Sequence, residues 1–208
     1  MEQKKVSKRL LARLPVYLNY VKSLPEGTVN ISATKIAEAL GLGDVMVRKD
    51  LAKVSSGARR KLGYVREYLI RDMEAFLDVN TATGAVIVGA GKLGRALLDY
   101  SGFENSGLDI LAGFDARPAV KKSDGGKSVF PVSKLEAFCA GHDVHIGIIA
   151  VPSDSAQEVC DRLIGCGIRA IWNFAPVHLN VPEDIVVQNE NLSGSLTALR
   201  LQLRSRGK

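Results

Sequence analysis

Apolar residues in the first third of the chain recur at helical spacing. In residues 7–23 they follow the period of a helix with one buried face: Leu10, Leu11, Leu14, Leu18 and Val21. Pro15 lies inside this stretch, and because proline has no backbone N–H we expect it to interrupt or kink the helix. The same spacing predicts further helices over residues 32–40, with Ser32 as the cap, and over residues 44–54 and 65–77.

From residue 80 onward, short apolar runs rich in β-branched residues alternate with helical stretches. The predicted strands are residues 85–88, 109–114, 144–151, 168–172 and 185–187. The predicted helices are residues 93–101, 133–140, 154–165 and 193–204. This alternation is typical of a parallel sheet with crossover helices, so an α/β fold is expected. Residues 80–84 resemble a linker, which predicts a first domain over residues 1–79 and a second domain over residues 80–190.

The helices predicted over 32–40 and 44–54 are joined by a three-residue turn, Gly41–Gly43, as in a helix-turn-helix motif. The second helix of that motif enters the major groove of DNA by its N-terminal part. Side chains that we expect to be exposed there are Met46, Arg48, Lys49 and Lys53. A long cation can bond phosphate oxygens or guanine, and the sequence leaves open which cation does which. An ordinary helix pair with a glycine turn is the alternative.

The next segment carries three cations between two glycines. Arg59, Arg60 and Lys61 lie between Gly57 and Gly63, and Tyr64 follows. A short basic hairpin of this kind is typical of a wing that contacts the DNA backbone or a minor groove. An exposed basic loop without a partner is the alternative. Together with the four helices, the wing predicts a winged-helix domain.

The charge distribution favours a nucleic-acid partner for that domain. Residues 1–79 hold 15 Lys/Arg and 9 Asp/Glu, whereas residues 80–208 hold 13 of each. The whole net charge of +6 therefore lies in the first domain. A basic domain joined to a neutral one suggests a DNA-binding module attached to a ligand-binding module. A solvated basic face is the alternative.

Composition excludes several classes of protein. With 46% hydrophobic and 24% charged residues, the chain is globular in character. No apolar run approaches the ~18 residues of a membrane span, and no secretory signal is visible, so we expect a cytoplasmic protein. The three cysteines (Cys139, Cys160 and Cys166) include no C-x-x-C pair and are expected to be small core residues; a thiol redox switch stays open. The histidines lack zinc-like partners, so no metal site is expected.

A glycine-rich loop follows the strand predicted over residues 85–88. Gly89-Ala90-Gly91-Lys92-Leu93-Gly94 fits the pattern G-x-G-x-x-G, and Asp115 ends the next strand 21 residues after Gly94. This arrangement predicts a dinucleotide site, with the pyrophosphate at the helix start and Asp115 on the adenosine ribose. The carboxylate favours NAD(H) over NADP(H), although Arg117 lies nearby. A glycine turn without a nucleotide is the alternative.

Two further loops follow predicted strands, where a Rossmann-type site opens. Val151-Pro152-Ser153 and Asn173-Phe174-Ala175-Pro176 are candidates for the nicotinamide half, with plain turns as the alternative. Neither loop carries a His, Lys or Tyr that could act as the general acid or base of hydride transfer. The sequence therefore favours a protein that senses the nucleotide over an enzyme that uses it.

The C-terminal stretch, residues 191–208, carries a stripe of leucines at spacings of four, three and four: Leu192, Leu196, Leu199 and Leu203. An amphipathic helix must bury such a stripe. The stripe could pack on its own domain or on a second subunit. Because palindromic DNA sites are bound by dimers, we favour the second subunit.

These motifs, in this order, resemble the Rex family of bacterial NAD(H)-responsive transcriptional repressors. The resemblance rests on segments spread over nearly the whole chain: residues 47–51, 60–64, 88–97 and 173–182. It implies a homodimer of winged-helix and Rossmann domains with exchanged C-terminal helices, in which NADH releases palindromic operator DNA. It also implies that Lys49 and Arg60 contact DNA, and that Tyr100 and Leu192 lie near the nicotinamide.

The resemblance also implies a difference from some members, in which an Arg on the first helix pairs with an Asp before the C-terminal helix. By position these would be Asn19 and Asn191 here, which carry no charge. We therefore expect a redox-sensing repressor, not an enzyme, whose coupling between domains does not use that ion pair. An NAD-dependent oxidoreductase and a DNA-binding protein indifferent to nucleotide are the alternatives.

Overall fold

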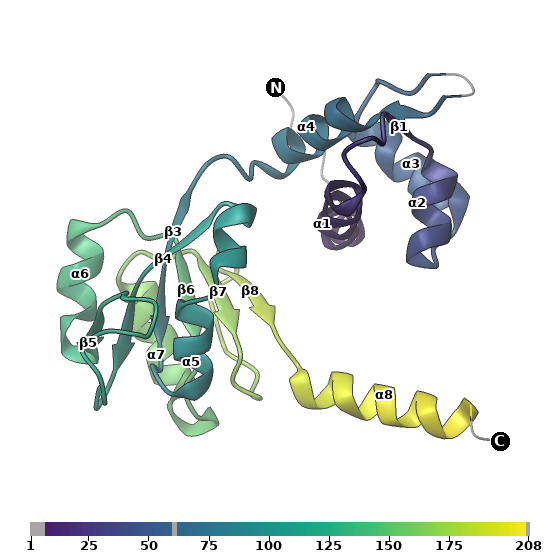
Figure 1. The fold of residues 1–208 in the computed structure, drawn as a ribbon. Helices are drawn as coiled ribbons and strands as arrows, with labels where there is room; N and C mark the ends of the chain where they lie inside the picture. The colour runs from purple at the N-terminus through teal and green to yellow at the C-terminus, as the bar shows by residue number, and fades with distance from the viewer. Residues whose placement is uncertain (1–6, 60–61, 207–208) are drawn as a thin grey trace. The chain divides into compact units, whose positions relative to one another are not determined.

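A computed structural model of the chain describes residues 7–59 and 62–206. Backbone packing divides the chain into two compact units, residues 1–81 and 82–208 (Figure 1). Within the described residues, no helix is long and apolar enough to cross a membrane.

The first unit is built from helices and one short hairpin of strands. Its elements are α1 (Lys8–Ser23), β1 (Asn30–Ile31), α2 (Ala33–Leu40), α3 (Asp44–Val54), β2 (Tyr64–Val65) and α4 (Arg66–Leu77). The two strands pair antiparallel, with Asn30 opposite Val65. A further antiparallel bridge joins Arg59 to Gly63 at the base of the wing. This is the winged-helix architecture that the sequence predicts.

Local signals in the sequence fix the ends of these helices. The Ser32 side chain accepts a hydrogen bond from Lys35 N at 3.1 Å and so caps α2. Gly41 then ends α2 in the left-handed region at φ +64°, a conformation that glycine adopts without strain. The expectation that Pro15 interrupts the first helix is wrong, because α1 runs through it without a break. Pro15 has no N–H and so cannot make one backbone hydrogen bond of the helix. The helix continues because the buried side chains around Pro15 pack in the core, while the proline ring itself is exposed.

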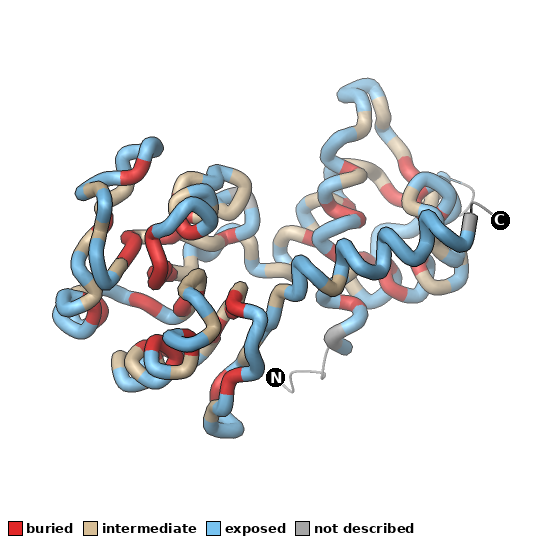
Figure 2. Tube along the Cα trace, turned by 90° about the horizontal axis from the view of Figure 1, so that it is seen from below, coloured by how far each residue is buried: buried red, intermediate tan, exposed pale blue. Residues whose placement is uncertain are grey.

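The core of the first unit gathers the inner faces of all four helices. Its side chains with no exposed surface include Leu14, Tyr17, Ile36, Leu51, Leu69 and Met73. Figure 2 shows the helices of the chain with buried stretches in red beside exposed stretches in pale blue. The recognition helix candidate, α3, is thus held by Val47 and Leu51, which leaves its opposite face to solvent.

The second unit is a six-stranded parallel sheet with helices on both faces (Figure 1). Its strands lie in the order β5-β4-β3-β6-β7-β8. They are β3 (Thr83–Val88), β4 (Leu108–Asp115), β5 (Val129–Pro131), β6 (Ile146–Ile149), β7 (Ala170–Asn173) and β8 (Val186–Asn189). The order reverses between β3 and β6, and ligands of open α/β sheets bind at the carboxyl ends of strands at such a point.

Alternating side chains of β3 build two separate cores. Val86 and Val88 pack with α6 (Leu135–Gly141) and α7 (Ser153–Gly165) on one face. Ala85 and Ile87 pack with α5 (Lys92–Leu98) on the other face. A central strand of a parallel sheet is buried on both faces, which explains its continuous apolar run. Three further elements complete the unit: the 3₁₀ turns η1 (Ser101–Ser106) and η2 (Val132–Lys134), and the C-terminal helix α8 (Leu192–Arg206).

Most elements of the second unit lie near the predicted ranges, and the clearest differences are the following. β3 begins at Thr83, inside the predicted linker, and β6 has half the length of the strand predicted over residues 144–151. The helix predicted over 93–101 ends at Leu98, and η1 follows as a separate turn closed by Gly107 at φ +73°. The edge strand β5 was not predicted, because three residues ending in proline show no alternation.

Candidate nucleotide and DNA sites

The glycine-rich loop connects β3 to α5 at the point where the strand order reverses. Gly89 has φ +102°, and a Cβ there would lie 2.5 Å from the carbonyl oxygen of Ala150. A Cβ on Gly94 would lie 1.7 Å from the carbonyl oxygen of Gly89. Both glycines are therefore required by the fold itself, one for the turn and one for close packing of α5 on the loop.

Gly91 differs from its two neighbours in the motif. It has an ordinary φ of −70°, and a Cβ there would meet no atom of the protein within 4 Å. The fold therefore gives no reason for glycine at this position. Open space beside the backbone at the start of α5 is what a pyrophosphate needs for close approach, so the loop fits a dinucleotide. Lys92 and Leu93, which the sequence also predicts at this site, are exposed in the first turn of α5.

Asp115 lies at the carboxyl end of β4 and faces this loop. Its Oδ2 accepts a hydrogen bond from Ala90 N at 2.8 Å, and its Oδ1 accepts one from Arg117 N at 2.9 Å. The two backbone N–H groups fix the carboxylate at the entrance of the site. The predicted partners Gly89, Ala90 and Asp115 are thus brought together, while the Arg117 side chain is exposed.

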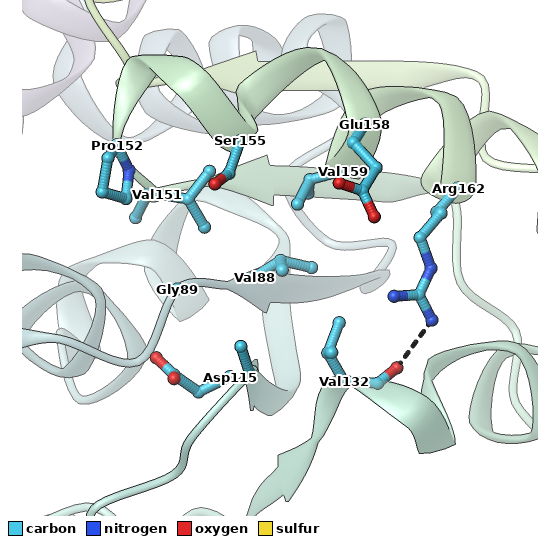
Figure 3. Close-up of a pocket in the computed structure, with 12 residues that line it drawn as sticks. Val88, Gly89, Asp115, Val132, Val151, Pro152, Ser155, Glu158, Val159 and Arg162 are labelled. Atoms are coloured by element: carbon cyan, nitrogen blue, oxygen red, sulfur yellow. Dashed lines mark hydrogen bonds between the residues drawn. The ribbon is translucent and has the colours of Figure 1, made fainter.

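A pocket of about 270 Å³ extends from this carboxylate along the sheet (Figure 3). Besides Gly89 and Asp115, it contains the predicted Val151 and Pro152 of the loop after β6. Its remaining walls come from residues that sequence reasoning did not single out: Val88, Ala116, Val132, Ala150, Ser155, Glu158, Val159 and Arg162. The walls are mostly apolar and the volume suits part of a dinucleotide, namely a flat base beside a ribose.

Arg162 closes the end of the pocket that is formed by α7. Its Nε and Nη2 donate to Glu136 Oε1 at 2.9 and 2.8 Å, and Nη2 also donates to Val132 O at 2.9 Å. The guanidinium holds the pKa of Glu136 below its usual value. No local signal could have found this residue, because its partners lie 26 and 30 residues away in the chain.

The loop after β7 is held by Asn173, whose side chain is fully buried. Its Nδ2 donates to Ala175 O, Val177 O and Asn189 Oδ1 at 3.1, 3.0 and 2.9 Å, and Ala175 N donates to its Oδ1 at 3.0 Å. The Asn173 side chain, predicted to contact the nucleotide, is thus engaged within the protein. It shapes the loop that presents Phe174, which is half-buried.

A row of aromatic rings runs from η1 to this loop. Tyr100 and Phe103 lie edge to face with 4.8 Å between ring centroids, as do Phe103 and Trp172 at 5.3 Å. The rings of Trp172 and Phe174 are tilted, with centroids 4.7 Å apart. Trp172 Nε1 donates to Glu190 Oε1 at 2.8 Å. Tyr100 is 59% exposed at the end of the row. The structure thus links Tyr100 to Phe174 through two aromatic residues that the sequence analysis did not single out.

The outer face of α3 presents the cations predicted to contact DNA. Arg48, Lys49 and Lys53 are exposed, and Met46 is half-buried. Arg48 Nη2 lies 2.6 Å from Asp44 Oδ2, and Asp44 Oδ1 accepts from Thr34 Oγ1 at 2.9 Å. Among the ion pairs of the described residues, none involves Lys49 or Lys53. The two lysines are therefore the freer charges for a polyanion.

An ion pair orients α3 from its buried side. Arg13 Nη2 of α1 lies 2.7 Å from Asp50 Oδ2, and Tyr17 Oη donates to the same oxygen at 3.1 Å. Asp50 is 4% exposed, so this carboxylate is compensated inside the domain. Asn19, the position that the resemblance compares with a charged residue, is exposed on α1.

Of the three cations predicted on the wing, one lies within the described residues. Arg59 is exposed, whereas Arg60 and Lys61 lie outside the described residues. Gly63 has φ +78°, and a Cβ there would lie 2.4 Å from Ile31 O, so the wing fits closely against β1. Tyr64, predicted to contact DNA, is only 4% exposed, and burial raises its pKa. Its ring packs in the core of the domain and has no free face for DNA.

The leucines of α8 are exposed in the single chain. Leu192, Leu196, Leu199 and Leu203 are 60%, 67%, 62% and 73% exposed. An apolar stripe of this length seldom stays in water. Packing on its own domain, one of the two possibilities left open by the sequence, is not observed for these side chains.

Two family models match the chain, one on each unit. Residues 5–52 match the family described as "Putative DNA-binding protein N-terminus". Residues 80–177 match the family described as "CoA binding domain".

Curated relatives match over nearly the full length. The chain is 39% identical to the redox-sensing transcriptional repressor Rex of Porphyromonas gingivalis, covering 97% of this chain and 93% of that protein. It is 36% identical to the protein of the same name from Desulforamulus reducens, and the match covers 100% of both chains. These relatives are named as transcriptional repressors and not as enzymes, in agreement with the expectation from the sequence.

Solved structures agree with the curated relatives. RSP in complex with β-NAD⁺ and operator DNA has a TM-score of 0.87 at 33% identity, covering 99% of this chain and 95% of that one. RSP in complex with β-NADH gives the same TM-score and identity, covering 99% and 97%. RSP is described as a Rex-family repressor. With full-length identity above 35% to curated members and this shared fold, the chain belongs to the Rex family of redox-sensing transcriptional repressors.

Proposed function

We propose that this protein is a transcriptional repressor that binds operator DNA and senses the balance of NADH and NAD⁺, with NADH releasing it from the operator. The observation that carries the proposal is the Asp115 carboxylate, held by Ala90 N next to the open space at Gly91. The same chain carries a basic winged helix. A site for a dinucleotide and a surface for a polyanion in one protein support a regulatory role for the nucleotide.

The nucleotide site begins at the glycine-rich loop. The backbone N–H groups at the start of α5 bind the pyrophosphate, and Asp115 accepts hydrogen bonds from the adenosine ribose. A 2′-phosphate would meet the negative charge of that carboxylate, so NADH is preferred over NADPH. Phe174 and Tyr100 lie toward the nicotinamide half, together with Leu192 at the start of α8. Val151 and Pro152, which the sequence also suggested for that half, line the pocket beside Asp115 and so belong to the adenosine half.

The DNA site is the outer face of α3 together with the wing. Lys49 and Lys53 bind the major groove or its phosphates, and Arg59 to Lys61 contact the backbone beside it. Asp44 holds Arg48 at 2.6 Å, so Arg48 reaches DNA in a fixed orientation. The ion pair of Arg13 and Asp50 keeps α3 at a constant position in its domain.

The exposed leucine stripe of α8 supports a homodimer. Each C-terminal helix, residues 191–208, packs on the partner subunit and buries its leucines there. A twofold dimer presents two recognition helices, which matches a palindromic operator. We place this repressor in the cytoplasm, where bacterial DNA and the NADH pool are both present.

Titration of operator binding with each nucleotide tests the proposal. A typical allosteric coupling of ~1–3 kcal/mol changes affinity about 5–150-fold. NADH is expected to weaken binding of a fluorescent operator duplex within that range, and NAD⁺ is expected to leave it tight. The control is a duplex of scrambled sequence at the same salt concentration. An operator affinity that neither nucleotide changes would refute the sensor function.

A further inference from the structure

The pocket beside Asp115 ends in two polar side chains that the proposed function does not use. Glu158 and Arg162 lie one helical turn apart on α7 and line the pocket beside three valines: Val88, Val132 and Val159. Figure 3 shows both side chains pointing into the pocket, on the side away from Gly89 and Pro152.

The position of Asp115 determines which part of the nucleotide would reach these side chains. With the adenosine ribose on Asp115, the base extends between the valines. The edge of adenine most remote from the ribose carries the N6 amino group and the ring nitrogen N1. That edge would face Glu158 and Arg162.

The hydrogen-bonding state of the two side chains suits this edge. Arg162 is fixed because its Nε and Nη2 donate to Glu136 and to Val132 O. Its Nη1 makes no hydrogen bond among the described residues, and Figure 3 shows it turned toward the pocket. Glu158 likewise has no hydrogen bond or ion pair within the described part of the chain. A fixed donor therefore stands beside a free acceptor.

We propose that Glu158 and Arg162 read the base of the bound dinucleotide and select adenine. The Glu158 carboxylate accepts a hydrogen bond from N6, and Arg162 Nη1 donates one to N1. Hypoxanthine reverses both groups, because it has an acceptor oxygen at position 6 and an N–H at position 1. The carboxylate would then face an acceptor and the guanidinium would face a donor. This inference rests on the proposed function, because it needs a dinucleotide in the pocket.

The test compares NADH with reduced nicotinamide hypoxanthine dinucleotide, which differs from NADH only in the base. Binding of each to the full-length protein is measured by isothermal titration calorimetry. Loss of a hydrogen bond to a charged group predicts about tenfold weaker binding of the hypoxanthine compound. In Glu158→Gln the amide can accept from N6 or donate to the oxygen, so the preference should fall to about twofold or less. Asp161→Asn is the matched control, because it makes the same chemical change on α7 at a residue bonded to Gln157.

The outcomes separate this inference from the proposed function. Equal binding of the two compounds by the unaltered protein would overturn the base-reading role and leave the sensor function intact. A preference that Glu158→Gln leaves unchanged would also overturn it, since the valines alone would then account for binding. Failure to bind either compound would refute the nucleotide site itself. Circular dichroism of both variants checks that they are folded.

Discussion

Asp115 Oδ2 accepts a hydrogen bond from Ala90 N at 2.8 Å, across 25 positions of the chain. The residue assigned to the ribose therefore also holds the glycine-rich loop in place. A substitution at Asp115 that removes the charge and both acceptor oxygens disturbs the ribose site and the loop, whereas one that keeps an acceptor for Ala90 N leaves that bond to the loop in place.

The first prediction uses this difference. Asp115→Asn keeps one acceptor oxygen, which can serve Ala90 N, but it loses the acceptor for Arg117 N and the charge that repels a 2′-phosphate. We expect NADPH to bind this variant more tightly than it binds the unaltered protein, with a smaller change for NADH. Asp115→Ala should weaken NADH by about tenfold, because the hydrogen bonds to the ribose are lost as well. Calorimetric titration with both nucleotides measures the ratio of the NADH affinity to the NADPH affinity. If this ratio is the same in both variants as in the unaltered protein, the assignment of Asp115 to the ribose is contradicted.

The second prediction separates ligand approach from folding within one loop. Gly91→Ala places a Cβ in open space, so the thermal unfolding temperature should not change, while NADH binding should fall by at least about tenfold. Gly94→Ala places its Cβ 1.7 Å from Gly89 O and should lower stability by about 1–3 kcal/mol. Gly141→Ala, also in open space but remote from the loop, is the control for both measurements. Full NADH affinity in Gly91→Ala would contradict the pyrophosphate assignment.

The third prediction concerns the recognition helix. Lys49→Ala should weaken operator binding by about 1–3 kcal/mol if Lys49 bonds a base. If Lys49 bonds a phosphate, specific and scrambled duplexes should weaken equally, and the slope of log K against log salt should fall by about 1. Lys122→Ala, an exposed lysine of the second unit, is the matched control for loss of charge. Unchanged affinity and slope would remove Lys49 from the interface.

The fourth prediction concerns the leucine stripe of α8. Leu199→Glu puts a charge in the middle of the stripe, so a subunit interface formed by these leucines should dissociate. Sedimentation velocity should then report a monomer where the unaltered protein is a dimer. Gln202→Glu adds the same charge to the same helix at an exposed polar position and should stay dimeric. A dimeric Leu199→Glu protein would mean that the stripe is not the interface.

The fifth prediction addresses the cysteines. Burial raises the pKa of Cys139 to about 12 and that of Cys160 to about 11, and it also raises the pKa of Cys166. Because the thiolate is the reactive form, raised pKa values mean slower alkylation at any given pH. At pH 8 iodoacetamide should label Cys139 and Cys160 at least a hundredfold more slowly in the folded protein than in urea, as followed by mass spectrometry. Rapid labelling of the folded protein would instead support the alternative that these cysteines form a thiol redox switch.

Most of the fold could be predicted from local patterns in the sequence. The helix over residues 44–54 has its predicted bounds, because the glycine turn before it and the apolar spacing within it are both short-range signals. Gly89, Ala90 and Asp115 could be placed in one site for a similar reason, since a strand, a helix and the next strand form one unit with known handedness.

The features that the sequence did not predict depend on contacts between segments that are distant in the chain. Arg162 meets Glu136 and Val132 only because α6 and α7 pack on the same face of the sheet. The burial of Tyr64 depends on how the wing folds back onto the helices, which no periodicity reports. Asn173 follows a strand as a ligand-binding residue does, yet its amide closes a loop with Asn189 of a neighbouring strand.

The row of aromatic rings contains a fluorophore that can report on the bound nucleotide. Trp172 is the single tryptophan of the chain, and its indole N–H is bonded to Glu190, two residues before α8 begins. Reduced nicotinamide absorbs in the wavelength range where indole emits, whereas the oxidised form does not. Energy transfer from this fluorophore can therefore distinguish the two redox states of the ligand without any label. Its emission maximum reports, in the same sample, on the surroundings of the indole, which include the hydrogen bond to Glu190.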